Sequence, residues 1–208
     1  MSKFVIVIFA ILAIGGVFDS AFAQNAVPPP VANPVSGAVA TIDTSLGTIT
    51  IALDPGHAPR TVANFVRYAR EKHFDGTVIY RVVPGFVIQM GSYEASSSSP
   101  RSTHDGIPLE ANNGLSNTRG SVAMARGSDP SSGTAEFFVD LSDNSATLDH
   151  SASDTSNSTG YAVFGHVVSG MDVVDKIASA PLGDNGPFAG AAPQTPIVIQ
   201  SVTVSGQP

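Results

Sequence analysis

Cysteine and tryptophan are absent from this sequence of 208 residues, and charged residues make up only 13% of it. Without cysteine, the chain can form no disulfide bond, thiolate metal site or cysteine nucleophile. Ten Lys and Arg residues against 17 Asp and Glu residues give a net charge of -7. Because a protein that binds a phosphate backbone needs a basic face, nucleic acid is not an expected partner. The hydrophobic fraction of 42% instead indicates a folded domain with a real core.

The common catalytic motifs are also missing. The sequence contains no G-x-S-x-G elbow, no Walker loop, no G-x-G-x-x-G and no H-E-x-x-H. Its five histidines are scattered without metal-ligand spacing, so we predict neither a metal site nor a cofactor. Asp149 and His150 could belong to a serine triad, but the missing elbow disfavours that interpretation.

The N-terminus has the order of a secretory signal peptide. Lys3 supplies a positive charge, an apolar and glycine run follows from Phe4 to Val17, and Ala21-Phe22-Ala23 is a small-residue cleavage pattern. The alternative is a membrane anchor, but this run is shorter than the ~20 residues that span a bilayer. We therefore expect a signal peptide over residues 1–23 and an exported protein, periplasmic if the host has two membranes. After cleavage, no membrane contact is expected.

A proline-rich segment separates the signal peptide from the folded domain. Residues 24–37 contain Pro28, Pro29, Pro30 and Pro34, so they cannot continue a helix or a central strand. We interpret them as an extended linker. A ligand for a proline-binding domain is the alternative, without specific support. The folded domain is predicted to occupy residues 38–208.

Within that domain, short runs of alternating or β-branched apolar residues dominate. Ile49, Ile51 and Leu53 alternate with smaller or polar residues, the period of a half-buried strand. A helix is expected to start at Pro59 and to be closed by Gly76, and a second over Met171–Ala178. Strands are predicted over residues 39–44, 48–53, 78–83, 86–90, 120–125, 136–140, 162–168 and 197–204.

This pattern predicts an all-β dominated fold. Eight strands without βαβ alternation, in a chain of this size, favour a closed antiparallel β-barrel whose two α-helices cover its open ends.

Several stretches depart from simple alternation. Residues 81–89 read R-V-V-P-G-F-V-I-Q, residues 123–126 read A-M-A-R and residues 136–139 read E-F-F-V. Two further stretches, A-N-N-G-L-S-N-T-R-G at 111–120 and G-Y-A-V-F-G at 160–165, follow the same order along the chain.

Together these motifs resemble the cyclophilin-type peptidyl-prolyl cis-trans isomerases, and in particular their secreted bacterial branch. The resemblance extends from about Val39 to about Val204. It implies an eight-stranded barrel capped by two helices, in agreement with the strand and helix count. It also implies an enzyme that accelerates rotation about X-Pro bonds in unfolded or extended polypeptides, without metal or cofactor.

The resemblance assigns two groups of site residues. It implies that Arg81 donates a hydrogen bond to the imide nitrogen, and that Gln89 holds the substrate carbonyl and orients Arg81. A twisted imide returns its lone pair to nitrogen, so a donor there acts more strongly on the transition state than on the ground state. The implied substrate-binding residues are Phe86, Val87, Ala125, Arg126, Glu136, Phe138, Leu148 and Tyr161.

Two positions depart from the family pattern. Glu136 stands where the family has Gln, and its carboxylate could either steady Arg81 or hold its donors away from the substrate. Thr147 falls at or next to a position usually filled by Trp or Phe, so weak cyclosporin binding is expected.

These departures motivate a second hypothesis, a cyclophilin-fold binding or chaperone module with weak or no turnover. A third hypothesis is a small-molecule barrel, which would need an open interior. We expect a monomer that binds proline-containing polypeptides.

Overall fold

A computed structural model describes residues 37–95, 99–151, 159–184 and 187–206. The predicted signal peptide and all of the predicted linker except Gly37 lie outside these ranges. Within them, no helix combines the length and the apolar character needed to cross a bilayer.

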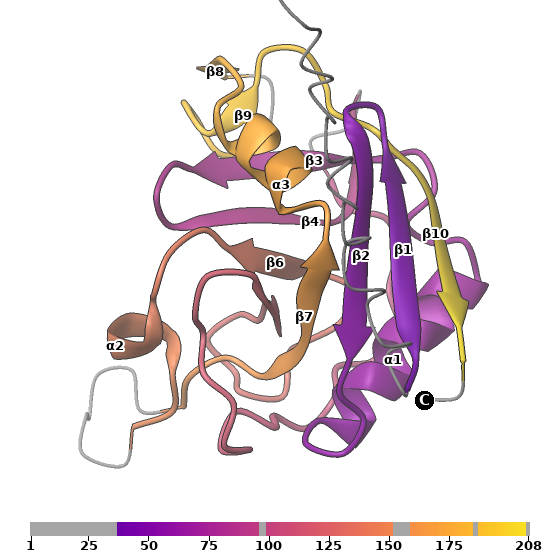
Figure 1. Cartoon of the computed structure of the whole chain (residues 1–208), viewed down its shortest axis with the longest axis vertical. Coiled ribbons are helices and arrows are strands. Elements are labelled where there is room, and N and C mark those ends of the chain that lie inside the picture. The colour runs from indigo at the N-terminus through magenta and orange to yellow at the C-terminus, as the bar shows by residue number, and fades with distance from the viewer. Residues whose placement is uncertain (1–36, 96–98, 152–158, 185–186, 207–208) are drawn as a thin grey trace, which may run out of the picture. The chain divides into compact units, whose positions relative to one another are not determined.

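Eight strands form one antiparallel sheet in the order β10-β1-β2-β7-β5-β6-β4-β3, and β8 pairs with β9 separately (Figure 1). The strands are β1 (Val39–Thr44), β2 (Gly47–Leu53), β3 (Thr77–Val83), β4 (Val87–Glu94), β5 (Ser121–Met124), β6 (Phe137–Asp140), β7 (Val163–Ser169), β8 (Leu182–Gly183), β9 (Ala192–Pro193) and β10 (Ile199–Ser205).

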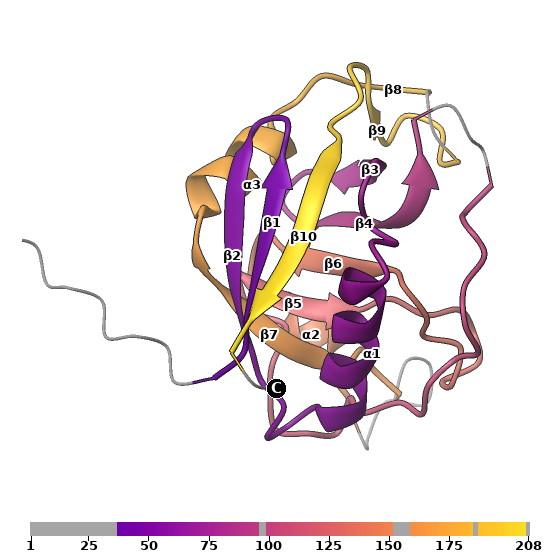
Figure 2. The same cartoon turned by 90° about the vertical axis from the view of Figure 1, so that its right-hand side faces the viewer.

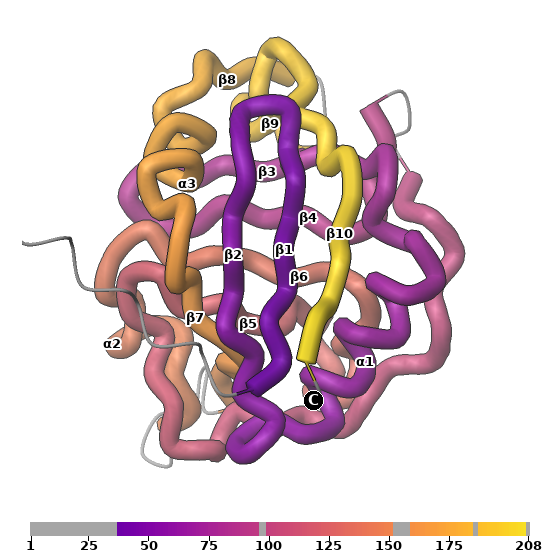
Figure 3. The backbone as a smooth tube through the Cα atoms, turned by 45° about the vertical axis from the view of Figure 1, so that its right-hand side comes forward, coloured from indigo at the N-terminus to yellow at the C-terminus, as the bar shows by residue number. Residues whose placement is uncertain are grey.

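The two edges of the large sheet meet, so the barrel is nearly closed. The backbone N–H of Gly76 donates to Ile199 O at 2.8 Å, and that of Ile79 donates to Ile197 O at 3.0 Å. Val78 and Val198 form an isolated antiparallel bridge beside them. In Figure 3, the yellow segment leads from β9 down into β10, which runs beside β1. The predicted eight-stranded antiparallel barrel is therefore confirmed.

Helices α1 (Pro59–Arg70) and α3 (Met171–Ala178) lie on different sides of the barrel (Figure 2). Pro59 begins α1 because its missing N–H needs no partner in the first turn. The Glu110 carboxylate accepts the next two backbone N–H groups, from Arg60 at 3.1 Å and Thr61 at 2.8 Å. A distant side chain thus caps a helix that has no side-chain cap of its own.

The structure corrects some predicted boundaries. Helix α1 ends at Arg70 rather than near Gly76, because Lys72 adopts a positive φ of 56° that breaks the helix. The predicted strand at 86–90 is β4, which starts at Val87 and continues to Glu94. A third helix, α2 (Ser145–Leu148), was not predicted, since four residues are too few to show a helical period.

Alternation along the central strands creates two apolar clusters on opposite faces of the sheet. Phe137 and Val139 of β6 point into the main core, whereas Phe138 between them belongs to a second, outer cluster. In the main core, the Phe65 ring lies 5.3 Å from those of Phe74, Phe137 and Phe164. The interior is filled with side chains, which argues against a barrel that holds a small molecule.

Candidate functional site

The candidate site is built on a row of residues that crosses four neighbouring strands. Arg81 of β3 pairs with Gln89 of β4, Gln89 with Phe138 of β6, and Phe138 with Ala123 of β5. Cross-strand partners project from the same face of a sheet. This register therefore places the guanidinium, the amide and the phenyl ring side by side outside the barrel.

A surface pocket of about 300 Å³ lies over this row. Nine of the ten predicted site residues line it, together with Thr147: Arg81, Phe86, Val87, Gln89, Ala125, Arg126, Phe138, Leu148 and Tyr161. The residues come from β3, β4 and β6, from the turn between β3 and β4, from α2, and from the segments that follow β5 and precede β7. Tertiary structure thus brings together side chains whose outermost members, Arg81 and Tyr161, are 80 positions apart in the sequence.

Gln89 orients Arg81 directly. The Arg81 Nη1–H donates to Gln89 Oε1 at 3.0 Å. Both side chains are half-buried, and within the described ranges no second hydrogen bond engages the Arg81 guanidinium, which has five N–H donors.

The opposite wall of the pocket is apolar and aromatic. The rings of Phe138 and Tyr161 meet edge to face, with centroids 5.6 Å apart and planes at 77°. Val87 and Leu148 are buried in the same outer cluster, and Phe86 packs against it. Such a wall suits a small apolar ring.

The turn that carries Phe86 is held by its own backbone conformation and by hydrogen bonds from Ser142 and Asn144. Gly85 adopts a φ of +72°, which the second central position of a type II turn requires, after Pro84 at the first. The Asn144 Nδ2 group donates to Phe86 O at 2.9 Å and to the Asp140 Oδ1 atom at 2.7 Å. Ser142 Oγ donates to Gly85 O. Because both amide hydrogens of Asn144 are used, the turn is held rigidly over the outer cluster.

Asp140, below this turn, is fully buried, and its Oδ2 atom has no hydrogen-bond partner in the described part of the chain. Burial raises the pKa of Asp140 to about 7, although the hydrogen bond from Asn144 acts in the opposite direction.

Arg126 is anchored to the segment that supplies Tyr161. Its Nε donates to Gly160 O at 2.9 Å and its Nη2 to Thr159 Oγ1 at 2.6 Å. The guanidinium carbon lies 4.7 Å from the Tyr161 ring centroid, a cation–π contact. Arg126 therefore fixes the Tyr161 wall as well as adding a positive charge.

Glu136 is the predicted site residue that does not line the pocket. Its backbone carbonyl accepts from Ala125 N at 2.9 Å, but both carboxylate oxygens are buried and lack a hydrogen-bonded partner of good geometry among the described residues. Burial raises the pKa of Glu136, and the nearby Tyr80 and Ser92 side chains offset this only in part. No ion pair joins Glu136 to Arg81 in the described ranges.

The chemistry available in the pocket follows from its lining. The lining contains two guanidinium groups, an amide and a phenol, but no carboxylate and no imidazole. It can therefore enclose an apolar ring and donate hydrogen bonds to neighbouring oxygen or nitrogen atoms, but it presents no nucleophile paired with a base.

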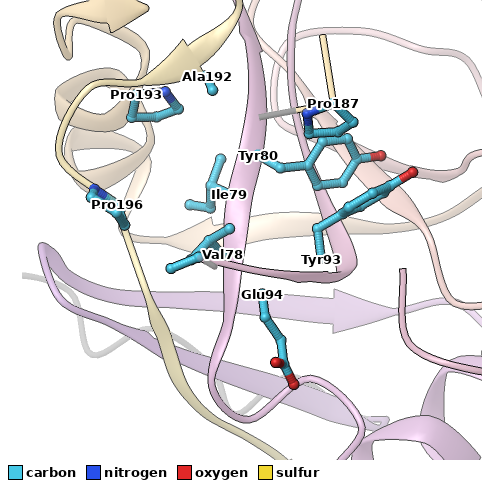
Figure 4. A pocket seen from close by; sticks show the side chains of 10 residues that line it. Val78, Ile79, Tyr80, Tyr93, Glu94, Pro187, Ala192, Pro193 and Pro196 are labelled. Carbon is cyan, nitrogen blue, oxygen red and sulfur yellow. The ribbon is translucent and has the colours of Figure 1, made fainter. Parts of the chain in front are cut away.

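A smaller pocket of about 20 Å³ lies beside β3, lined by Tyr80, Tyr93 and the segment that leads to β10 (Figure 4). Figure 4 shows the Tyr80 ring between Pro187 and the Tyr93 ring. Phe188 follows Pro187 in the sequence. Among the described residues, its ring is the only one over which the Arg81 guanidinium lies. Phe188 was not among the residues predicted from the sequence, because an isolated aromatic in a Gly- and Pro-rich loop carries no periodic signal.

Comparison with known proteins agrees with the family resemblance of the sequence motifs. Residues 39–204 match the family described as cyclophilin type peptidyl-prolyl cis-trans isomerase/CLD. The chain is 44% identical over 163 residues to peptidyl-prolyl cis-trans isomerase A of Dickeya dadantii, covering 78% of this chain and 82% of that protein. It is 42% identical over 165 residues to peptidyl-prolyl cis-trans isomerase B of Escherichia coli, covering 79% of this chain and 98% of that protein.

A solved structure shares the fold at lower identity. The crystal structure of a Cryptosporidium parvum cyclophilin type peptidyl-prolyl cis-trans isomerase, in the presence of the dipeptide Ala-Pro, superposes with a TM-score of 0.64. It is 19% identical and covers 81% of this chain and 99% of that one.

Proposed function

This chain belongs to the cyclophilin-type peptidyl-prolyl cis-trans isomerase family, and we propose that it catalyses cis-trans isomerisation of X-Pro bonds in unfolded or extended polypeptides. The observation that supports this proposal most strongly is the Arg81–Gln89 pair beside an apolar pocket that could hold a proline ring. The reaction makes and breaks no covalent bond, and it needs neither a nucleophile nor a base.

In the proposed mechanism, Arg81 acts on the twisted imide. The planar ground state delocalises the nitrogen lone pair into the carbonyl, so the nitrogen accepts no hydrogen bond. Rotation returns the lone pair to nitrogen, and a guanidinium N–H then donates to it. Because this interaction is absent in the ground state, it lowers the barrier rather than merely tightening binding. Gln89 Oε1 accepts a hydrogen bond from the Arg81 Nη1–H group and so helps to orient the guanidinium, and no other hydrogen bond engages that guanidinium among the described residues.

The remaining pocket residues are proposed to hold the substrate. Phe86, Val87, Phe138 and Leu148 would enclose the proline ring, whose burial contributes about 1.5–3 kcal/mol for a side chain of this size. Ala125 and Arg126 would pair with the substrate backbone, and Tyr161 would form the wall behind it. The Cryptosporidium parvum crystal was obtained with the dipeptide Ala-Pro, a substance of the class proposed here.

We propose that Glu136 does not restrain Arg81. Its carboxyl oxygens are buried, burial raises its pKa and so favours the neutral form, and no ion pair joins it to Arg81 among the described residues. A neutral carboxyl resembles the amide that the family has at this position in both size and hydrogen-bonding capacity. Glu136 would therefore leave Arg81 unrestrained.

Export is proposed from the order of charged, apolar and small residues over positions 1–23. The weak cyclosporin binding, the monomeric state and the lack of nucleic-acid binding expected from the sequence remain predictions.

A protease-coupled cis-to-trans assay on a short X-Pro peptide tests the function, with wild type, Arg81→Ala and Glu136→Gln compared. We expect wild type to accelerate isomerisation, Arg81→Ala to lose about 100-fold or more in kcat/KM, and Glu136→Gln to stay within about twofold. A rise in Glu136→Gln would show that the carboxylate restrains Arg81. If wild type binds the peptide without acceleration, the binding-module hypothesis replaces the enzyme.

A further inference from the structure

Phe188 is a large apolar side chain on the surface of the protein. It is 44% exposed, and the described residues contain one other large hydrophobic side chain of comparable exposure, Val168 at 48%. Single exposed hydrophobic residues are common and need no explanation by themselves. The contacts of Phe188 distinguish it from Val168.

The loop that carries Phe188 is tied to the edge of β3. Ala191 N–H donates to Phe188 O at 3.2 Å, and Val82 N–H donates to Ala191 O at 2.7 Å. Gly190 N–H donates to Asp184 Oδ1 at 2.7 Å. Because Val82 directly follows Arg81, these bonds hold the Phe188 ring next to the guanidinium.

The ring contacts two consecutive residues of β3. It stacks on Tyr80, with centroids 5.9 Å apart and planes at 24°, and Tyr80 is itself buried against Tyr93 at 4.4 Å. The Cζ atom of Arg81 lies 5.7 Å from the Phe188 ring centroid, within the range of a cation–π contact. The buried Tyr80, itself packed on the half-buried Tyr93, therefore supports Phe188, and Phe188 in turn lies against Arg81.

We propose that Phe188 is a positioning residue, whose ring holds the Arg81 guanidinium in the orientation that the twisted imide requires. This inference rests on the proposed function of Arg81.

The hydrogen bond that Arg81 donates to Gln89 does not by itself fix the guanidinium. It engages one nitrogen, Nη1, and a long side chain with several rotatable bonds keeps much of its freedom around a single contact. A carboxylate partner would restrict it further but would occupy the N–H groups that the substrate needs. An aromatic ring restricts the guanidinium plane through its π face and leaves every N–H available. Phe188 thus complements Gln89 without competing with the substrate.

Kinetics of Phe188→Leu, Phe188→Tyr and the control Val168→Ala test the proposal. Leucine keeps apolar volume but removes the π face, whereas tyrosine keeps the ring. We expect Phe188→Leu to lower kcat on the order of fivefold with KM within about twofold, because a contact of this kind contributes modestly at an exposed site. Phe188→Tyr and Val168→Ala should retain kcat within about twofold, and thermal melts should show each variant folded.

Two further measurements separate positioning from a general effect. In an Arg81→Lys background, Phe188→Leu should change kcat by less than about twofold, since the planar guanidinium is gone. The NMR resonance of the Arg81 Nε–H group should move in Phe188→Leu, because a ring current has been removed, and should return toward its wild-type position in Phe188→Tyr.

The outcomes distinguish this inference from the function on which it rests. If Arg81→Ala keeps wild-type activity, the role of Arg81 fails. If Arg81→Ala is inactive but Phe188→Leu has a wild-type kcat and an unmoved Nε–H resonance, only the positioning role of Phe188 fails. A raised KM with unchanged kcat would also overturn positioning, since it would make Phe188 a substrate contact.

Discussion

Two buried carboxyl groups lie close to the pocket without facing it. Asp140 lies below the turn that carries Phe86, and Glu136 immediately precedes β6. In both, burial raises the pKa, so the fold favours the protonated form. A carboxyl buried in this way lowers stability when it ionises, whereas a paired surface carboxylate does the opposite.

The pH dependence of stability tests this for Asp140. Its pKa rises from 3.8 to about 7 on folding, so the native state binds its proton more tightly than the unfolded state. The contribution of Asp140 to the free energy of unfolding should therefore fall as the pH rises between about 4 and 7. Asp140→Asn keeps the acceptor for Asn144 but cannot ionise, and at pH 8 it should be about 1–3 kcal/mol more stable than wild type.

Urea denaturation at pH 5 and pH 8 measures this difference. Asp143→Asn is the control, because Asp143 is exposed and hydrogen bonds from Ser145 lower its pKa. Some slope should remain in Asp140→Asn from Glu136. Parallel stability profiles of wild type and Asp140→Asn would contradict the prediction.

At the scale of elements, the short helix α2 and the β3–β4 turn form the two sides of the pocket mouth. Asn144, the N-cap residue of α2, accepts the backbone N–H of Leu148 at 2.9 Å and donates from its side chain to Phe86 O. One residue therefore sets the spacing between Phe86 and Leu148.

Asn144→Ala should widen this spacing. Loss of both Nδ2 hydrogen bonds frees the turn, and we expect kcat/KM to fall about tenfold, because small displacements of positioning groups are costly in catalysis. The matched control is Ser145→Ala, which removes an exposed hydroxyl from the same helix. Kinetics on the X-Pro peptide, with thermal melts to check folding, provide the measurement. An equal kcat/KM in Asn144→Ala and Ser145→Ala would contradict the prediction.

At the scale of the whole molecule, the described domain contains the residues of the proposed chemistry, whereas the proposed export depends on residues 1–23. Export predicts cleavage after Ala23, which leaves 208 − 23 = 185 residues beginning at Gln24. N-terminal sequencing and mass spectrometry of protein recovered from the cell envelope or medium should find this end. Ala23→Phe, which removes a small residue from the cleavage pattern, should accumulate the uncleaved form; an intact Met1 in exported wild type would contradict the prediction.

The barrel could be predicted because its information is local. Successive residues of a strand point to opposite faces, whichever strand lies beside it. This explains the alternation at Ile49, Ile51 and Leu53, and it places the neighbours Phe137 and Phe138 in different clusters. Helix α1 was predicted to be too long because nothing in the apolar pattern marks Lys72 as the residue with positive φ.

The gathering of the site residues was expected from motif resemblance, and the register of β3, β4, β6 and β5 gives its physical basis. Their individual roles await the kinetic tests.

The sequence by itself determined the strand pattern, the two main helices and the stretches that carry the family resemblance, because these depend on neighbours along the chain. Tertiary structure alone decided that Glu136 is buried away from the pocket lining, that Glu110 caps α1 and that Phe188 lies against Arg81. Each of these depends on contacts between segments distant in sequence. Such contacts leave no periodic pattern, since they are set by packing in three dimensions.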